Sequence, residues 1–117
     1  MATYLGRRAP RVDLYLEQGA DFAQPLVYRN SDGTPVDLTG YTAAAQVRKS
    51  VGSATVALAL TVTLGADGAI TLSAPAAATE AVAIDKGVWD LELTAPGGAV
   101  TRLLSGDVIV DKGVTRG

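Results

Sequence analysis

The chain has 117 residues, of which 48% are hydrophobic and 19% charged, and its net charge is −2. This length suits one domain, and the composition is typical of a chain with a buried core rather than a disordered one. The balanced charge argues against a nucleic-acid-binding surface, and the lack of cysteine and histidine excludes disulfides, thiolate metal sites and histidine-based catalysis.

The N-terminal residues 1–10 are expected to form an arm outside the domain, because they are polar, basic and end in proline. They contain no apolar segment of signal-peptide length, and no part of the chain approaches the ~20 apolar residues of a membrane helix. The basic residues near this end are interpreted either as a solvated or interface-bound arm or as a contact with an acidic partner. The candidate protein-interaction residues are two apolar anchors and three arginines: Tyr4, Leu5, Arg7, Arg8 and Arg11.

Two strands are predicted at the start of the domain. Residues Arg11 to Glu17 alternate between apolar and polar side chains, which is the period of a half-buried strand. A turn at Gln18 and Gly19 leads into a second strand, Ala20 to Arg29, with Phe22, Leu26 and Tyr28 facing inward. Pro25 lies within it, and because proline lacks an N–H group we expect an edge position or a kink there.

Turn residues separate the next segments. Asn30 to Gly33 is rich in turn formers, and Thr34 to Gly40 is expected to be a short extended piece. Tyr41 to Lys49 contains three consecutive alanines that could favour a helix, but the Thr, Tyr and Val around them favour a strand. Ala54 to Leu64 is predicted as a longer strand with Val56, Leu58, Leu60 and Val62 inward.

The last part of the chain is predicted to hold two hairpins and a helical turn. Ala69 to Ala74 is expected to pair with the preceding strand across a turn at Asp67 and Gly68. Pro75 to Ile84 begins with proline and is rich in alanine, so we expect one or two helical turns that cross between sheets. Gly87 to Val110 is predicted as a hairpin, interrupted at Ser105 and Gly106, with Trp89, Leu91 and Leu93 on its buried face.

Seven or eight short strands at regular spacing are typical of an antiparallel β-sandwich or barrel. The predicted division is an arm at 1–10, the β domain at 11–111 and a polar tail at 112–117.

Several residues could carry chemistry. The carboxylates of Asp90 and Glu92 could form a glycosidase-type pair, but on an outward strand face we expect them to be solvated or paired with Arg102. Asn30, Asp32 and Asp37 could suggest calcium, although their spacing lacks the twelve-residue calcium loop, and turn formation is the preferred interpretation. Gly33, Gly97 and Gly98 precede no helix and so predict no phosphate site. We therefore expect no catalytic residue, no metal and no cofactor.

Trp89 and the tyrosines offer an alternative, a sugar-binding platform. The alternation places Trp89 in the core, which would leave Tyr4, Tyr15 and Tyr41 as the candidate aromatic surface residues.

Five stretches of the sequence resemble one group of known proteins. They are LEQGADF (16–22), RNSDGTPVDLTGYT (29–42), PAAAT (75–79), GVWDLELT (87–94) and TRLLSGDVIV (101–110). The chain from about Val12 to Val110 resembles small immunoglobulin-like β-sandwich proteins of tailed-bacteriophage particles, such as the N-terminal domain of baseplate upper proteins.

The resemblance implies an immunoglobulin-like, all-β sandwich that acts as a non-enzymatic structural protein of the virion. It implies an adaptor or connector in the tail, baseplate or fibre attachment region, made in the host cytoplasm and bound to other phage particle proteins as a symmetric homo-oligomer. A capsid-surface decoration protein and a carbohydrate-binding module for host adsorption are the alternatives. No contact with nucleic acid or membrane is expected, and no residue of a family active site is carried over.

Overall fold

Short runs of alternating apolar and polar residues give this chain its strands, because alternate side chains point to opposite faces of a sheet. The computed structural model describes residues 10–114 and has seven strands and one short helix. The elements are β1 (Leu14–Glu17), β2 (Phe22–Val27), β3 (Thr42–Arg48), β4 (Leu58–Leu64), β5 (Ala69–Ala74), α1 (Ala76–Glu80), β6 (Lys86–Thr94) and β7 (Val100–Asp111).

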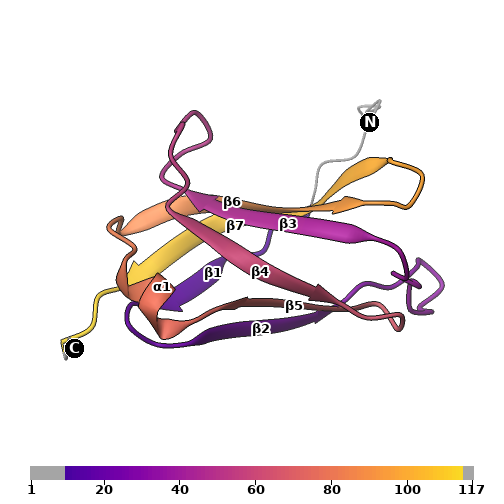
Figure 1. Ribbon diagram of the computed structural model, residues 1–117, viewed down its shortest axis with the longest axis horizontal. Helices are drawn as coiled ribbons and strands as arrows, with labels where there is room; N and C mark the ends of the chain where they lie inside the picture. The colour runs from indigo at the N-terminus through magenta and orange to yellow at the C-terminus, as the bar shows by residue number, and fades with distance from the viewer. Residues whose placement is uncertain (1–9, 115–117) are drawn as a thin grey trace, which may run out of the picture.

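The strands form the two layers of an immunoglobulin-like β-sandwich (Figure 1). One layer contains β1, β7, β6 and β3, and the other contains β5 and β2. Strand β4 belongs to both, because Leu58 and Leu60 pair with β3 whereas Thr61 to Leu64 pair with β5. The strand order is therefore continuous, β1-β7-β6-β3-β4-β5-β2, and the predicted all-β immunoglobulin-like sandwich is confirmed.

One strand pair departs from the predicted antiparallel arrangement. Strands β1 and β7 run parallel, with Leu14 opposite Val108 and Leu16 opposite Val110. The pairing continues upstream as an isolated parallel bridge between Arg11 and Ser105. Parallel neighbours need a long connection, which is supplied here by the rest of the domain.

The core lies between the layers and consists largely of leucine and valine. Leu16 of β1, Leu72 of β5 and Leu91 of β6 are completely buried. Trp89 is 3% exposed, which confirms its predicted core position. Its indole Nε1 donates a hydrogen bond of 2.6 Å to the backbone carbonyl of Val12, so the one polar atom of the side chain is satisfied.

Several predicted strands are too long. The first strand begins at Leu14 rather than Arg11, and the second covers Phe22–Val27 rather than Ala20 to Arg29. The fourth begins at Leu58, and Val56 is 36% exposed rather than inward. Residues 49–57 form a loop whose end is held by a hydrogen bond of 2.7 Å from Ala57 N to the carbonyl of Val47, so pairing with β3 sets the strand start.

Two further predictions concern single positions. Pro25 lies in β2, which pairs with β5 alone, so the predicted edge position is confirmed. The predicted interruption of the last strand at Ser105 and Gly106 is wrong, because β7 runs through both residues. Its irregularity lies at Leu103, which is an extra residue between Arg102 and Leu104 opposite β6.

Candidate functional site

The predicted interaction residues fall mostly outside the described part of the chain. Tyr4, Leu5, Arg7 and Arg8 lie there, so their role stays a prediction. Arg11 is described and exposed, and its Nη2 lies 3.3 Å from the Asp107 carboxylate of β7. It stands where the chain enters the domain, at the wall of an open groove.

This groove has a volume of about 1170 Å³. Its walls are residues 10–12, residues 26–31 at the end of β2, and residues 100–105 at the start of β7, with Ile70 of β5 below. Figure 1 shows the end of β2 and the start of β7 in opposite layers. The groove is thus the place where one side of the sandwich stays open.

Arginine side chains line the groove, and two of the three are ion-paired with carboxylates beside it. Three arginines line it, Arg11, Arg29 and Arg102, and none of the described lining residues is acidic. Arg102 Nε lies 3.2 Å from the Asp90 carboxylate on the outer face of β6, so the predicted pairing of Asp90 with Arg102 is confirmed. Arg29 Nη1 donates to the carbonyl of Gly33 and has no ion-pair partner among the described residues. Its charge is therefore available to a carboxylate.

A smaller hollow of about 300 Å³ adjoins the groove at the end of the sandwich. Tyr28 and Tyr41 both line it, and both are only half exposed. Tyr15 is 68% exposed but lies on β1, which β7 and β6 separate from β3. Tyr15 and Tyr41, the two described residues of the predicted aromatic surface, therefore do not share a surface on which a sugar ring could stack.

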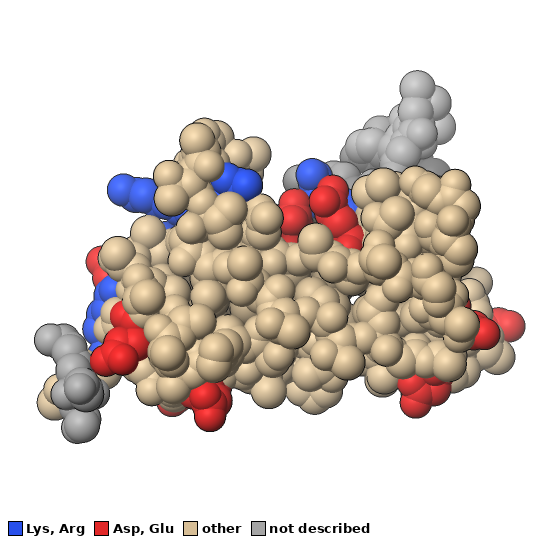
Figure 2. All heavy atoms as spheres, in the orientation of Figure 1, with Lys and Arg blue, Asp and Glu red and all other residues tan. Residues whose placement is uncertain are grey.

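A second surface is notable because it lacks charge. Asp67 is the only charged residue between Ser50 and Thr79, a stretch that contains β4 and β5. Figure 2 shows few charged side chains over the middle of this face. The exposed residues of β4 are small and neutral: Ala59, Thr61 and Thr63. Depletion of charge is typical of the centre of protein–protein interfaces.

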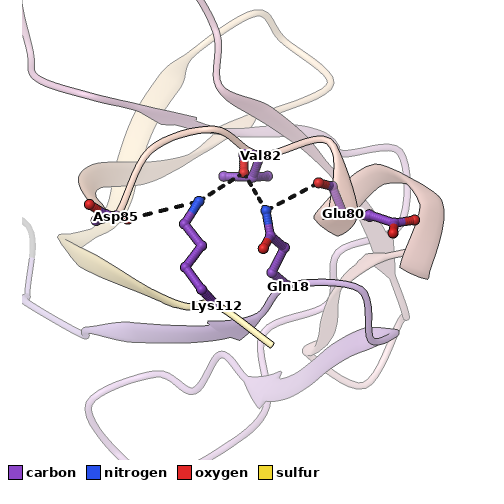
Figure 3. Close-up of polar contacts among 5 residues, drawn as sticks. All are labelled: Gln18, Glu80, Val82, Asp85 and Lys112. Atoms are coloured by element: carbon purple, nitrogen blue, oxygen red, sulfur yellow. Dashed lines mark hydrogen bonds and ion pairs between the residues drawn. The ribbon is translucent and has the colours of Figure 1, made fainter. Parts of the chain in front are cut away.

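A polar cluster closes the opposite end of the sandwich (Figure 3). Gln18 Nε2 donates to the carbonyls of Glu80 and Val82, at 3.2 and 2.9 Å. Lys112 Nζ donates to the same Val82 carbonyl at 3.3 Å and lies 3.9 Å from Asp85. These contacts hold the crossover after α1 against the ends of β1 and β7, so the cluster has a structural role.

The acidic turn residues also have a structural role. Asp32 Oδ1 accepts hydrogen bonds from the hydroxyl and the backbone N–H of Thr34, and Asp37 Oδ1 does the same with Thr39. Each carboxyl therefore has a pKa below its usual 3.8. The hydrogen bond from the threonine hydroxyl is the larger cause, and the bond from the threonine backbone N–H is the second. The turn interpretation is confirmed.

Within residues 10–114, no three potential ligands come together as a metal site would require. Nor does the described part of the chain include a helix long and apolar enough to span a membrane.

Comparison with known proteins does not assign the chain to a family. No protein-family model matches the chain, and no curated protein matches its sequence. Among solved structures, the titin M3 domain covers 90% of this chain at 10% identity, with 93% of its own length aligned and a TM-score of 0.46. The Lin-41 filamin domain covers 80% at 16% identity, with 81% of its length and a TM-score of 0.43. The N-terminal domain of phage TP901-1 ORF48 covers 85% at 14% identity, with 84% of its length and a TM-score of 0.48.

The sequence did not reveal the groove. Its wall residues Leu26, Ile70 and Leu104 are far apart in the chain and carry no motif. They come together because β2 is the edge strand of one layer and the first part of β7 extends beyond its neighbour β1 in the other layer, and both facts depend on strand order.

Proposed function

We propose that this protein is a non-enzymatic structural component of a tailed-bacteriophage particle. In this proposal it is an adaptor or connector in the tail, baseplate or fibre attachment region and binds other particle proteins. The observation that carries it is the open groove, whose walls include the outer edge of β2 and residues 100–104 of β7, which β1 does not cover. Such edges bind extended chains readily, and the resemblance of the sequence to phage sandwich proteins gives the biological setting.

A binding role accounts for the described polar groups better than a catalytic one. Asp90 is paired with Arg102, and Asp32 and Asp37 are bound in turns. The groove offers apolar side chains, backbone and arginines, which are suited to holding a polypeptide.

The uncharged face over β4 suits a second contact, between copies of the chain. We propose a symmetric homo-oligomer that is made in the host cytoplasm and built into the virion. Weak contacts that are repeated around a symmetric particle add through avidity.

Cryo-electron microscopy of the intact particle tests the proposal. Density for this sandwich at the tail, neck or baseplate would support the adaptor role and identify the neighbouring proteins. Density on the capsid surface would replace it with a decoration role, and no density anywhere would reject a virion role and favour carbohydrate binding.

Deletion of residues 1–9 tests the arm separately. If Tyr4, Leu5, Arg7 and Arg8 anchor the protein, the shortened chain will fold with a buried Trp89 but fail to enter particles. Deletion of residues 115–117 is the matched control and should leave incorporation unchanged. Normal incorporation of the chain without residues 1–9 would reject an anchoring role for the arm.

A further inference from the structure

Strand β2 is the last strand of its layer, and its outer edge faces away from β5, its only strand partner among the described residues. Directly after β2, the N–H of Tyr28 donates to the carbonyl of Gly68 at 2.8 Å, so the backbone of Tyr28 points to the β5 side. The backbone groups of successive residues in a strand point to alternate sides. The groups of Ala23, Pro25 and Val27 therefore face the outer edge.

An outer edge of this kind can pair with another chain, and proteins protect such edges with short strands, charges, bulges, proline or a covering element. Strand β2 has six residues, none of them charged, and it pairs with β5 without a bulge. The side chains on its outer face, those of Ala23, Pro25 and Val27, are exposed and uncharged. Among the described residues, the proline is thus the one protection that this edge has.

Both backbone groups of residue 25 are removed from pairing with another chain. Pro25 has no N–H, and because the missing donor would face the outer edge, no hydrogen bond to β5 is lost. The Pro25 carbonyl, which faces the same edge, accepts a hydrogen bond of 3.1 Å from Nε2 of Gln24. The middle of the edge therefore has no donor, and its acceptor already has a partner.

A second copy of the chain is the partner that this edge would otherwise fit. Two identical edges can pair antiparallel about a two-fold axis. If the pair is centred on residue 25, Ala23 of each copy lies opposite Val27 of the other, and Asp21 lies opposite Arg29, so opposite charges meet at both ends. The central pair is then Pro25 opposite Pro25, where both hydrogen bonds are missing.

The face beside the edge would not keep two copies apart. Thr71 and Ser73 of β5 lie opposite Pro25 and Ala23, and the outward residues of β4 next to them are also small and neutral. No charge on this face opposes a sheet that continues from one copy into the next. The obstacle is confined to the middle of β2.

We propose that Pro25 and Gln24 form a stop that prevents two copies of the chain from joining through their β2 edges into one continuous sheet. The stop leaves Val27 available, and Val27 lines the groove, so the wall of the groove is not affected. The inference goes beyond the proposed function and does not depend on it, because the stop acts on the chain alone.

The direct test is Pro25→Thr, which returns an N–H to the edge and places a strand-favouring residue there. Self-association of the full chain is measured by analytical ultracentrifugation over a range of concentrations. The variant should associate about tenfold more tightly than the unchanged chain, because a symmetric pair regains both central hydrogen bonds. Equal association of the two proteins would overturn the proposal.

The matched control is Ala23→Thr. It places the same side chain on the same outer face of β2, but the N–H of residue 23 is already present and Pro25 is kept. Its association should equal that of the unchanged chain. A gain as large as that of Pro25→Thr would show that the side chain, rather than the missing donor, matters, and would overturn the proposal.

Amide exchange locates the contact and also tests the unchanged chain. In the unchanged chain the amides of Ala23 and Val27 should exchange fast at every concentration, whereas those of Gln24 and Leu26 are protected by β5. Protection of Ala23 and Val27 would mean that a second copy or residues 1–9 already cover the edge, and would overturn the proposal. In Pro25→Thr both amides should become protected as concentration rises, and association without this protection would equally overturn it.

Gln24→Met tests the second part of the stop. Methionine has no amide donor, so the carbonyl of residue 25 becomes free for a partner chain. In the Pro25→Thr background, Gln24→Met should tighten association by a further factor of about three. Equal association with and without this change would overturn the role of Gln24.

Discussion

At the scale of single residues, one carbonyl group joins the first segment of the domain to its core. The carbonyl of Val12 accepts the indole hydrogen bond of Trp89 and lies directly over Gly106 of β7. A methyl group at Gly106 would overlap this oxygen, so glycine is required for the close approach. The Val12 N–H also donates to the carbonyl of Ser105, and Asp13 Oδ1 accepts the N–H of Asp107, so the segment is held on both sides of the glycine.

The replacement Gly106→Ala should therefore be strongly destabilising. We expect a loss of about 3 kcal/mol in the free energy of unfolding, because the Val12 backbone must move and its bond to Trp89 is lost. Gly97→Ala is the control, since Gly97 has open space around it and no left-handed backbone. Denaturation by urea would measure both variants, and equal midpoints would contradict the steric argument.

The lowered pKa of Asp32 gives a pH prediction. Its ionised form is favoured in the folded state, so its contribution to stability is complete above pH 3.8 and is lost as pH falls through the lower, folded-state pKa. In Thr34→Val the hydroxyl donor is gone, and the pKa of Asp32 should rise toward 3.8 while that of Asp37 stays low. Carboxyl NMR titration measures both, and Thr39→Val should give the converse result.

At the scale of elements, α1 depends on its surroundings. It has five residues and no side-chain cap of its own, and so short a helix is unstable alone. Asp21 Oδ1 accepts the N–H of Ala76 at 2.7 Å, and the hydroxyl of Thr79 donates to the Ala20 carbonyl at 2.8 Å. The Thr79 oxygen also accepts the N–H of Gly19, so the β1–β2 turn and the helix hold each other in place.

Thr79→Val would remove these bonds with little change in volume. Thr79 is 1% exposed, so the groups left unpaired are largely shielded from water, and we expect a loss of about 2 kcal/mol in unfolding free energy. Thr79→Ser keeps the hydroxyl and should lose markedly less. Thermal or urea unfolding would separate the two, and similar losses would indicate that packing rather than hydrogen bonding matters.

The strands show what a sequence can specify locally. Ala69–Ala74 was predicted with its observed bounds, because alternation, turn residues and pairing all agree there. Ala54 to Ala57 were predicted as strand and form part of a loop, because the length of β3 ends the pairing at Leu58. The three consecutive alanines lie in strand β3, as predicted, because the β-branched residues around them outweigh the helix propensity of alanine.

At the scale of the whole molecule, β4 ties the two layers together. Its first residues pair with β3 and its last with β5, so neither layer has a complete set of strands without it. Nothing local in Leu58 to Leu64 predicts this double membership, and the same is true of the parallel β1–β7 pair and of the groove. These features depend on contacts between distant parts of the chain, which alternation does not encode.

Because of this sharing, the two layers should unfold together. Leu60→Ala removes a buried side chain of β4 and should cost about 3 kcal/mol. Trp89 fluorescence reports on the unfolding of one layer, and amide exchange in the β2–β5 pair reports on the other. The unfolding midpoints from the two measurements should fall by the same amount. Two separate transitions would show that the layers are independent.

The parallel pair β1–β7 also decides how the domain responds to mechanical load. The chain enters the pair at Leu14, opposite Val108, and leaves it at Asp111, so the entry and exit points lie at opposite ends of one hydrogen-bonded ladder. Tension between these points pulls the two strands lengthwise past each other and loads all the ladder bonds at once instead of opening them one after another. A protein joined to its neighbours through both ends would thus resist a pulling force with the whole ladder of this strand pair.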